Sequence, residues 1–128
     1  MRLLLDTHTA LWWINEHERL SPTAKAMLLD ESNELYLSVV TLWEIAIKVS
    51  LNKLSEMPGG VEVFIAKVEE LPVQLVSLLP QYTSEVEKLP FIHRDPFDRM
   101  LITTAVKEGM TILTSDENIH RYDVPTVW

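Results

Sequence analysis

The segment Arg2-Leu3-Leu4-Leu5-Asp6 is a short apolar run that ends in a carboxylate. Such a run predicts a buried β-strand with Asp6 at its carboxyl end. Two later apolar runs also predict strands. One is expected over Glu34–Val40 and leads into a helix, and the other is expected over Thr111–Thr114 and precedes Asp116. Strands that alternate with helices predict an α/β fold of three layers, α/β/α, around a central and mainly parallel sheet.

Local signals give the remaining elements and their bounds. Asp95-Pro96 is the clearest helix start, with an N-cap residue followed by proline at the first helical position, and Gly109 is a typical stop. Thr41 and Glu44 have the spacing of a capping box. Further helices are expected over Thr9–Ile14, Pro22–Glu31, Thr41–Leu51, Val61–Glu70 and Pro80–Leu89, and further strands over Pro72–Leu78 and Val124–Trp128.

Length and composition restrict the class of protein. A chain of 128 residues with 47% apolar side chains predicts one folded domain over residues 1–128. Its longest apolar runs are far shorter than the ~20 residues that span a bilayer, so we expect no membrane segment and a cytoplasmic protein. The absence of cysteine excludes disulfides, thiolate metal sites and cysteine nucleophiles.

The formal net charge of −8 disfavours direct attraction to the nucleic-acid backbone, which rewards Lys and Arg. One exception is a carboxylate cluster that holds a divalent cation, because the cation inverts the local charge and attracts phosphate. Binding of nucleic acid by this chain therefore depends on whether its acidic residues cluster around a cation.

Four acidic residues are predicted to converge. Asp6 and Asp116 follow strand ends, Asp98 lies in the first turn of the helix that Asp95 caps, and Glu44 joins them from its own helix. Ligands of parallel sheets bind beyond the carboxyl ends of the strands. Carboxylates at this edge suit Mg²⁺ or Mn²⁺, and metals held in this way activate water for phosphodiester hydrolysis.

Simpler roles remain open for the same side chains. Asp6 and Asp116 are also acceptable cap or turn residues, and Asp98 suits the positive end of a helix dipole. Glu44 can simply be the capping-box partner of Thr41 and the ion-pair partner of Lys48, which lies one turn away. Asp95 is first an N-cap and second an additional or water-mediated metal ligand.

Basic and aromatic residues supply further candidates. Arg99 and Lys48 are candidate contacts for a substrate phosphate, with neutralisation of nearby acids as the alternative. Trp12, Trp13 and Trp43 are candidates for stacking on bases, although Trp13 can instead meet a partner chain and Trp43 is expected in the core.

The acids stand in segments that resemble a known family. Asp6 in Leu-Asp-Thr-His-Thr-Ala-Leu-Trp-Trp, Glu44 in Trp-Glu-Ile-Ala-Ile-Lys, Asp98 in Asp-Pro-Phe-Asp-Arg-Met-Leu and Asp116 in Leu-Thr-Ser-Asp are similar to the acidic quartet of PIN domains. The similarity extends from Leu4 to Tyr122. Within this family, the segments around Asp6 and Glu44 resemble one branch of the VapC-type toxins.

This resemblance implies a function and partners. It implies an Mg²⁺- or Mn²⁺-dependent ribonuclease that is toxic to its own cell and is restrained by a VapB-type antitoxin protein. We also expect a homodimer. Two alternatives are a catalytically weak PIN-like module that binds protein and a metal-dependent phosphatase. The phosphatase is disfavoured because Asp6-Thr7-His8 has no second aspartate two positions after the first.

Overall fold

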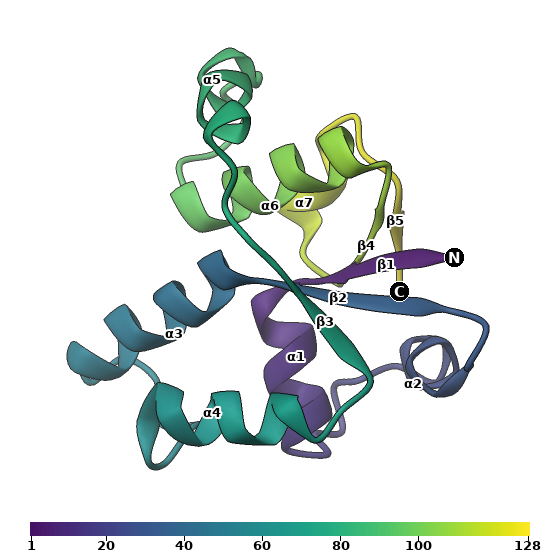
Figure 1. Ribbon diagram of the computed structural model, residues 1–128, viewed down its shortest axis with the longest axis vertical. Coiled ribbons are helices and arrows are strands. Elements are labelled where there is room, and N and C mark those ends of the chain that lie inside the picture. The colour runs from purple at the N-terminus through teal and green to yellow at the C-terminus, as the bar shows by residue number, and fades with distance from the viewer.

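Five strands form one sheet in the order β3-β2-β1-β4-β5, and every neighbouring pair is parallel (Figure 1). The computed structural model describes all residues from Met1 to Trp128. The strands are β1 (Arg2–Leu5), β2 (Glu34–Ser38), β3 (Val73–Val76), β4 (Thr111–Leu113) and β5 (Thr126–Val127). All five strands expected from the sequence are present, and the sheet is wholly parallel.

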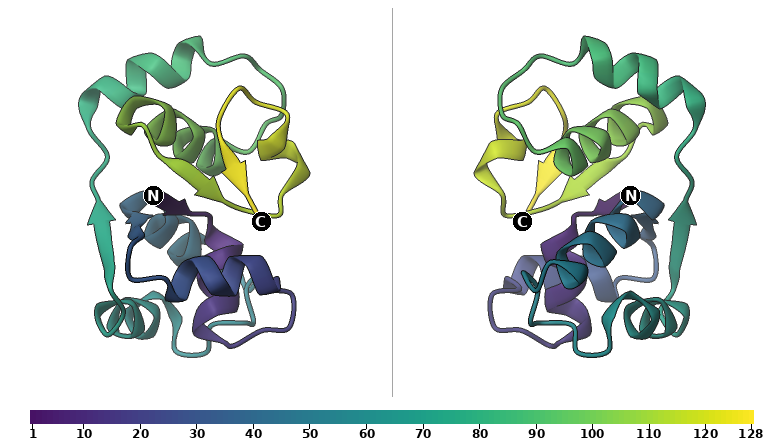
Figure 2. Two further views of the ribbon diagram at one scale, coloured as in Figure 1. Left: turned by 90° about the vertical axis from the view of Figure 1, so that its right-hand side faces the viewer. Right: turned by 90° about the vertical axis from the view of Figure 1, so that its left-hand side faces the viewer.

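Seven helices cover the two faces of this sheet. One layer contains α1 (Thr7–Ile14), α2 (Pro22–Leu29), α3 (Val39–Ser50) and α4 (Gly60–Glu69). The other contains α5 (Pro80–Lys88), α6 (Pro96–Glu108) and α7 (Glu117–His120). Figure 2 shows the two layers on opposite sides of the strands. The predicted α/β/α architecture is confirmed.

The alternation of side chains along the strands creates two cores. In β1, Leu3 and Leu5 enter the core shared with α1 to α4, whereas Leu4 enters the core shared with α6 and α7. All three are at most 1% exposed. Burial on both faces explains why β1 is a continuous apolar run rather than an alternating one.

Three helices differ from the expected pattern. α1 begins at Thr7, two residues before its expected start, because Asp6 caps it. α3 begins at Val39, because the Ser38 hydroxyl accepts a hydrogen bond from the Val40 amide at 3.0 Å and caps the helix. The capping box predicted at Thr41 is therefore wrong. The four-residue helix α7, capped by Asp116, was not predicted. By contrast, α6 starts at Pro96 and stops at Gly109 as expected.

The chain order creates a switch point between β1 and β4. The helices that follow β1 and β2 lie on one face, and the chain crosses to the other face after β3 (Figure 1). At such a point the loops beyond two adjacent strands separate and leave room for a ligand. Asp6 and Asp116 both lie at this place. No helix of the chain is both long and apolar enough to traverse a bilayer.

Candidate active site

Asp6 connects β1 to β4 at the switch point. It is 5% exposed and caps α1 by accepting the Thr9 amide hydrogen at 2.7 Å through Oδ1. Its Oδ2 accepts a hydrogen bond from the hydroxyl of Thr114, which follows β4. Burial raises the pKa of Asp6, against the hydrogen bonds from Thr114 and Thr9 that lower it. The carboxylate is thus fixed in position but has lost most of its hydration.

Glu44 is buried on α3 and has two partners. The Thr7 hydroxyl donates to Glu44 Oε1 at 2.6 Å, and the Lys48 ammonium forms an ion pair with Oε2. Thr7 Oγ1 also lies 3.3 Å from Thr41 Oγ1, so the start of α1 and the start of α3 are joined through these side chains. The predicted Glu44–Lys48 pair is confirmed.

Lys48 carries the positive charge that is closest to the Glu44 carboxylate. Burial disfavours its charged form, but the pKa of Lys48 is raised on balance by its hydrogen bond to Glu44 and by the charges of Glu44, Asp95 and Asp98. Acids from both α3 and α6 therefore act on one ammonium group.

Asp98 links these acids electrostatically. Burial raises its pKa to about 7, together with the charges of Asp95, Asp116 and Glu44, while a hydrogen bond from His93 acts in the opposite direction. The distance from His93 Nε2 to Asp98 Oδ2 is 3.1 Å. Charges from its own helix start and from two other segments act on Asp98, so Glu44, Asp95, Asp98 and Asp116 lie near one another.

Asp116 and Asp95 cap helices that start at the same edge. Asp116 Oδ1 accepts the Asn118 amide hydrogen at 2.8 Å, and the Asp116 amide donates to Thr114 Oγ1 at 3.0 Å. Thr114 thus lies between Asp116 and Asp6. Asp95 Oδ1 accepts the amide hydrogens of Phe97 and Asp98 at 2.9 and 3.0 Å, which confirms its predicted role as N-cap.

The donor set suits a hard divalent cation by its chemistry. The carboxylates supply only oxygen, and burial with mutual repulsion leaves them poorly compensated. As the side chains lie in the structure, no three His, Asp or Glu residues are placed to coordinate one metal ion. Hydrogen bonds and ion pairs to Thr114, Lys48 and His93 engage three of these carboxylates instead.

Arg99 does not extend towards the acidic edge. It is 8% exposed, and its guanidinium donates to the carbonyl oxygens of Pro90 and Leu89 at 2.9 and 3.2 Å and to the Tyr122 hydroxyl at 3.1 Å. The phosphate contact expected for Arg99 is at odds with this burial. Its side chain instead holds the segment between α5 and α6.

Sequence patterns did not reveal several residues that position the acids. His93 lies between Asp98 and the Tyr122 hydroxyl, with His93 Nδ1 2.8 Å from Tyr122 Oη. Thr7 and Thr114 hold Glu44 and Asp6. The two threonines had a usable signal, because Thr7 follows the Asp that ends one predicted strand and Thr114 is the last residue of another. His93 had none, since its partner Tyr122 is distant in sequence.

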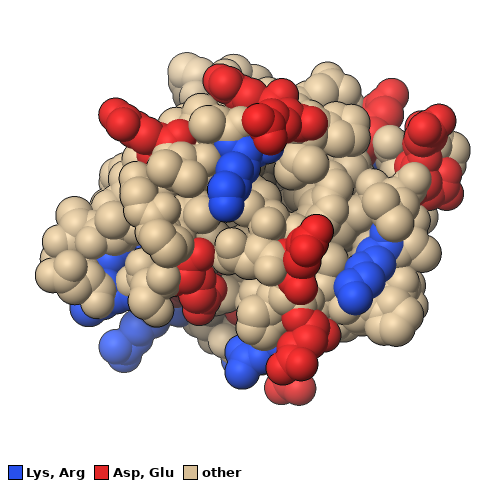
Figure 3. Space-filling view, turned by 90° about the horizontal axis from the view of Figure 1, so that it is seen from below, with Lys and Arg blue, Asp and Glu red and all other residues tan.

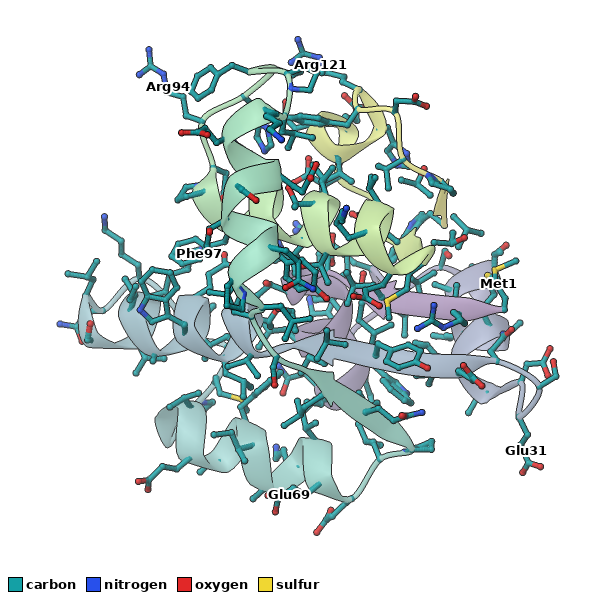
Figure 4. The ribbon with its side chains drawn as sticks, turned by 45° about the horizontal axis from the view of Figure 1, so that its top comes forward. Met1, Glu31, Glu69, Arg94, Phe97 and Arg121 are labelled. Atoms are coloured by element: carbon teal, nitrogen blue, oxygen red, sulfur yellow. The ribbon has the colours of Figure 1, made fainter.

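The tryptophans differ in their surroundings. Trp12 is enclosed by His8, His17 and Trp128, with ring centroids 5.6 to 5.9 Å apart. Trp43 is 58% exposed and meets Phe97 edge to face at 5.2 Å, so the core position expected for it is wrong. Figure 4 shows Phe97 on the side of α6 that faces α3.

Comparison with known proteins agrees with this architecture. The model of the PIN domain family matches residues 3–125, and the chain belongs to this family. It is 29% identical over 130 residues to Ribonuclease VapC22 of Mycobacterium tuberculosis (strain ATCC 25618 / H37Rv), with 98% of each chain covered.

Solved structures show the same fold at low sequence identity. The chain superposes on VapBC2 from Rickettsia felis bound to a promoter DNA fragment with a TM-score of 0.74 and 18% identity, covering 99% of this chain and 98% of that one. For Mycobacterium tuberculosis VapC20, described as a sarcin-ricin loop cleaving toxin, the TM-score is 0.71 at 14% identity, with 95% of each chain covered.

Proposed function

We propose that this PIN domain is a divalent-metal-dependent ribonuclease and the toxin of a toxin–antitoxin pair. One observation carries the proposal: the charges of Glu44 and Asp116, from two other segments, act on Asp98, and Thr114 joins Asp116 to Asp6 at the switch point of the sheet. The similarity to Ribonuclease VapC22 extends over 98% of both chains and supports the same reaction class.

Mg²⁺ or Mn²⁺ is the proposed cofactor, with Asp6, Asp98 and Asp116 as ligands directly or through water. When bound, such an ion supplies an activated water and stabilises the leaving oxygen of a phosphodiester. Asp6 is suited to the role because Thr9 and Thr114 fix both of its oxygens. Fixed ligands favour catalysis because they need no reorganisation during the reaction.

Glu44 has the second role in this proposal. It either completes the ligand set or orients the attacking water by accepting a hydrogen bond from it. Its burial at 3% exposure and the hydrogen bond from Thr7 hold the carboxylate in one orientation. Asp95 acts mainly through the helix start, because its Oδ1 accepts hydrogen bonds from the amides of Phe97 and Asp98, and its second oxygen suits a water-mediated contact with the metal.

The proposed protein partner is a VapB-type antitoxin, as in the VapBC complexes of similar fold. Two adjoining clefts of about 300 and 550 Å³ share Trp13 and Leu29 in their walls. Glu16 and Glu31 also line them, and Figure 4 shows Glu31 projecting into solvent. Lys25 also lines the smaller cleft, so its margin carries both charges, whereas Asp30 and Glu31 make the larger one acidic. Such clefts suit a partner segment that is apolar at its centre and basic where it meets Asp30 and Glu31.

A homodimer and a cytoplasmic location complete the proposal. Val39, Trp43 and Leu78 are 40%, 58% and 45% exposed, and Trp43 and Leu78 line one groove between α3, α5 and α6. Exposed apolar groups that adjoin one another are typical of protein interfaces. Light scattering of the purified chain tests the dimer, and the expected mass is twice 14.8 kDa.

Cleavage assays distinguish this function from its alternatives. With Mn²⁺ present, the purified protein is expected to cut RNA and to leave a phosphomonoester such as p-nitrophenyl phosphate intact. The reverse result identifies a phosphatase. Expression in cells supplies the second criterion: growth arrest by the wild type that disappears with Asp98→Asn supports a toxic nuclease, whereas persistent arrest supports a protein-binding module.

A further inference from the structure

Lys48 is the only Lys or Arg that forms an ion pair with one of the four acids. The structure contains four ion pairs in all: two join exposed partners, one joins His93 to Asp98, and one joins Lys48 to Glu44. Lys48 and Glu44 lie one turn apart on α3, which brings their side chains to the same face.

This pair differs from an ordinary helix-surface ion pair. The Glu44 side chain is 3% exposed, whereas the exposed pair between Lys107 and Glu85 has side chains 40% and 39% exposed. Surface pairs contribute little, but a buried carboxylate that loses its cation is left strongly uncompensated. The Thr7 hydroxyl alone, at 2.6 Å, supplies a hydrogen bond but no charge.

We propose that the Lys48 ammonium is the built-in counter-cation of the acidic site, which stabilises Glu44 when no metal is present and competes with a divalent cation for it. The proposal rests on the metal-dependent function above. Two cations that interact with one carboxylate weaken each other's binding, and this coupling is reciprocal. Lys48 is therefore a positioning residue that sets the metal affinity of the site.

Two other roles for Lys48 predict different results. If Lys48 only contacted an RNA phosphate, its removal would weaken RNA binding and leave the metal affinity unchanged. If Lys48 only stabilised α3, its removal would lower the melting temperature and would not tighten metal binding. Competition alone predicts that a neutral residue at position 48 binds the metal more tightly.

Calorimetric titration with Mn²⁺ in the absence of RNA tests the proposal. Lys48→Met is expected to bind Mn²⁺ about tenfold more tightly than the wild type, as loss of a competing charge implies. Its metal-free form should melt lower and gain more from Mn²⁺. Lys107→Met is the matched control, since it removes one Lys from an exposed pair and should leave the affinity within about twofold.

Further variants keep the result decisive. Lys48→Arg retains the charge and should bind Mn²⁺ like the wild type, and Glu44→Gln combined with Lys48→Met should lose the gain. If Lys48→Met does not fold, Lys48→Gln provides the same comparison. Equal or weaker Mn²⁺ binding by the neutral variant overturns the competition but leaves the nuclease proposal intact. Absence of Mn²⁺ binding by the wild type overturns both.

Discussion

At the scale of single residues, the site consists of acids that are each held by a specific neighbour. Thr114 and Thr9 hold Asp6, Thr7 and Lys48 hold Glu44, and His93 contacts Asp98. These partners restrict the carboxylates without removing the repulsion among them, which helps raise the pKa of Asp98 to about 7. A cation bound near these carboxylates would relieve that repulsion.

Single substitutions test the assignment of the four acids. Asp6→Asn, Glu44→Gln, Asp98→Asn and Asp116→Asn should each lower RNA cleavage about 100-fold or more, because each removes a charge at the proposed centre. Asp95→Asn should be mild, since asparagine still caps α6. Initial rates on one RNA, with circular dichroism as the check on folding, give the comparison. Equal loss at positions 95 and 98 would show that Asp95 is itself a ligand.

Tyr82 gives a pH prediction that is independent of the site. Burial and its hydrogen bond to Glu108 raise the pKa of Tyr82 from 10 to about 12. The folded state thus favours the neutral phenol, and this stabilisation is complete below pH 10 and disappears as the pH rises towards 12. Urea unfolding between pH 9 and 11.5 should show a loss of stability in the wild type that Tyr82→Phe lacks. Parallel pH profiles for the two proteins would contradict the assignment.

At the scale of elements, the spacing of polar and apolar residues along a helix does not by itself tell which side chains are exposed, because the neighbouring elements also cover part of the helix. Arg99 lies on α6 in a pattern that favours a charged surface, yet carbonyl oxygens between α5 and α6 surround its guanidinium. Trp43 is the opposite case. The stripe that contains Leu42 and Ile45 faces the core, and Trp43 points away from it towards Phe97.

Arg99→Met tests the structural role at this scale. Loss of the guanidinium removes the hydrogen bonds that a charged donor makes to the carbonyl oxygens of Pro90 and Leu89 and to the Tyr122 hydroxyl, and the free energy of unfolding should fall by about 1–3 kcal/mol. Arg94→Met should change it by less than about 0.5 kcal/mol, because Arg94 is exposed and projects outward in Figure 4. A stable Arg99→Met protein that has lost RNA binding would instead restore the phosphate role.

Element bounds were predictable where a local signal defines them. Asp95-Pro96 and Gly109 delimit α6 as the sequence indicates, because caps act through adjacent atoms. The start of α3 was misplaced by two residues, since Ser38 and Thr41 are both acceptable caps and the end of β2 decides between them. Helix α7 has four residues, too few for a helical period to show.

At the scale of the whole molecule, the sheet topology explains the convergence of the acids. Parallel strands and their crossovers bring Asp6 and Asp116 together across 110 residues of chain. The convergence was therefore predictable from strand ends alone. The Glu44–Lys48 pair was also predictable, because the two residues lie one helical turn apart. The contacts of His93 with Asp98 and Tyr122 were not, because no local spacing pattern indicates them.

The charge distribution also concerns the antitoxin. The face that α1, α2 and α4 help to form carries Asp and Glu side chains together with several Lys and Arg side chains, separated by uncharged surface (Figure 3). Trp13 lies in the two clefts shared by these elements and their neighbours. Trp13→Ala should weaken binding of the antitoxin by about 2 kcal/mol, roughly 30-fold in Kd, while the free enzyme keeps its RNA cleavage.

Calorimetry against the VapB-type antitoxin proposed above provides the measurement for Trp13. Trp12→Phe is a suitable control, because Trp12 packs against His8, His17 and Trp128. Antitoxin binding that is unaffected by Trp13→Ala would move the interface to another face. Binding without any loss of cleavage would contradict inhibition.

The central claim is that the gathered carboxylates cleave RNA with a divalent metal. The most direct measurement is the rate of RNA cleavage by protein treated with EDTA, before and after addition of Mn²⁺, for the wild type and for Asp98→Asn. The account predicts no cleavage after EDTA, recovery with Mn²⁺ in the wild type, and no recovery in Asp98→Asn at the same Mn²⁺ concentration. Undiminished cleavage in EDTA, or equal recovery by both proteins, would contradict it.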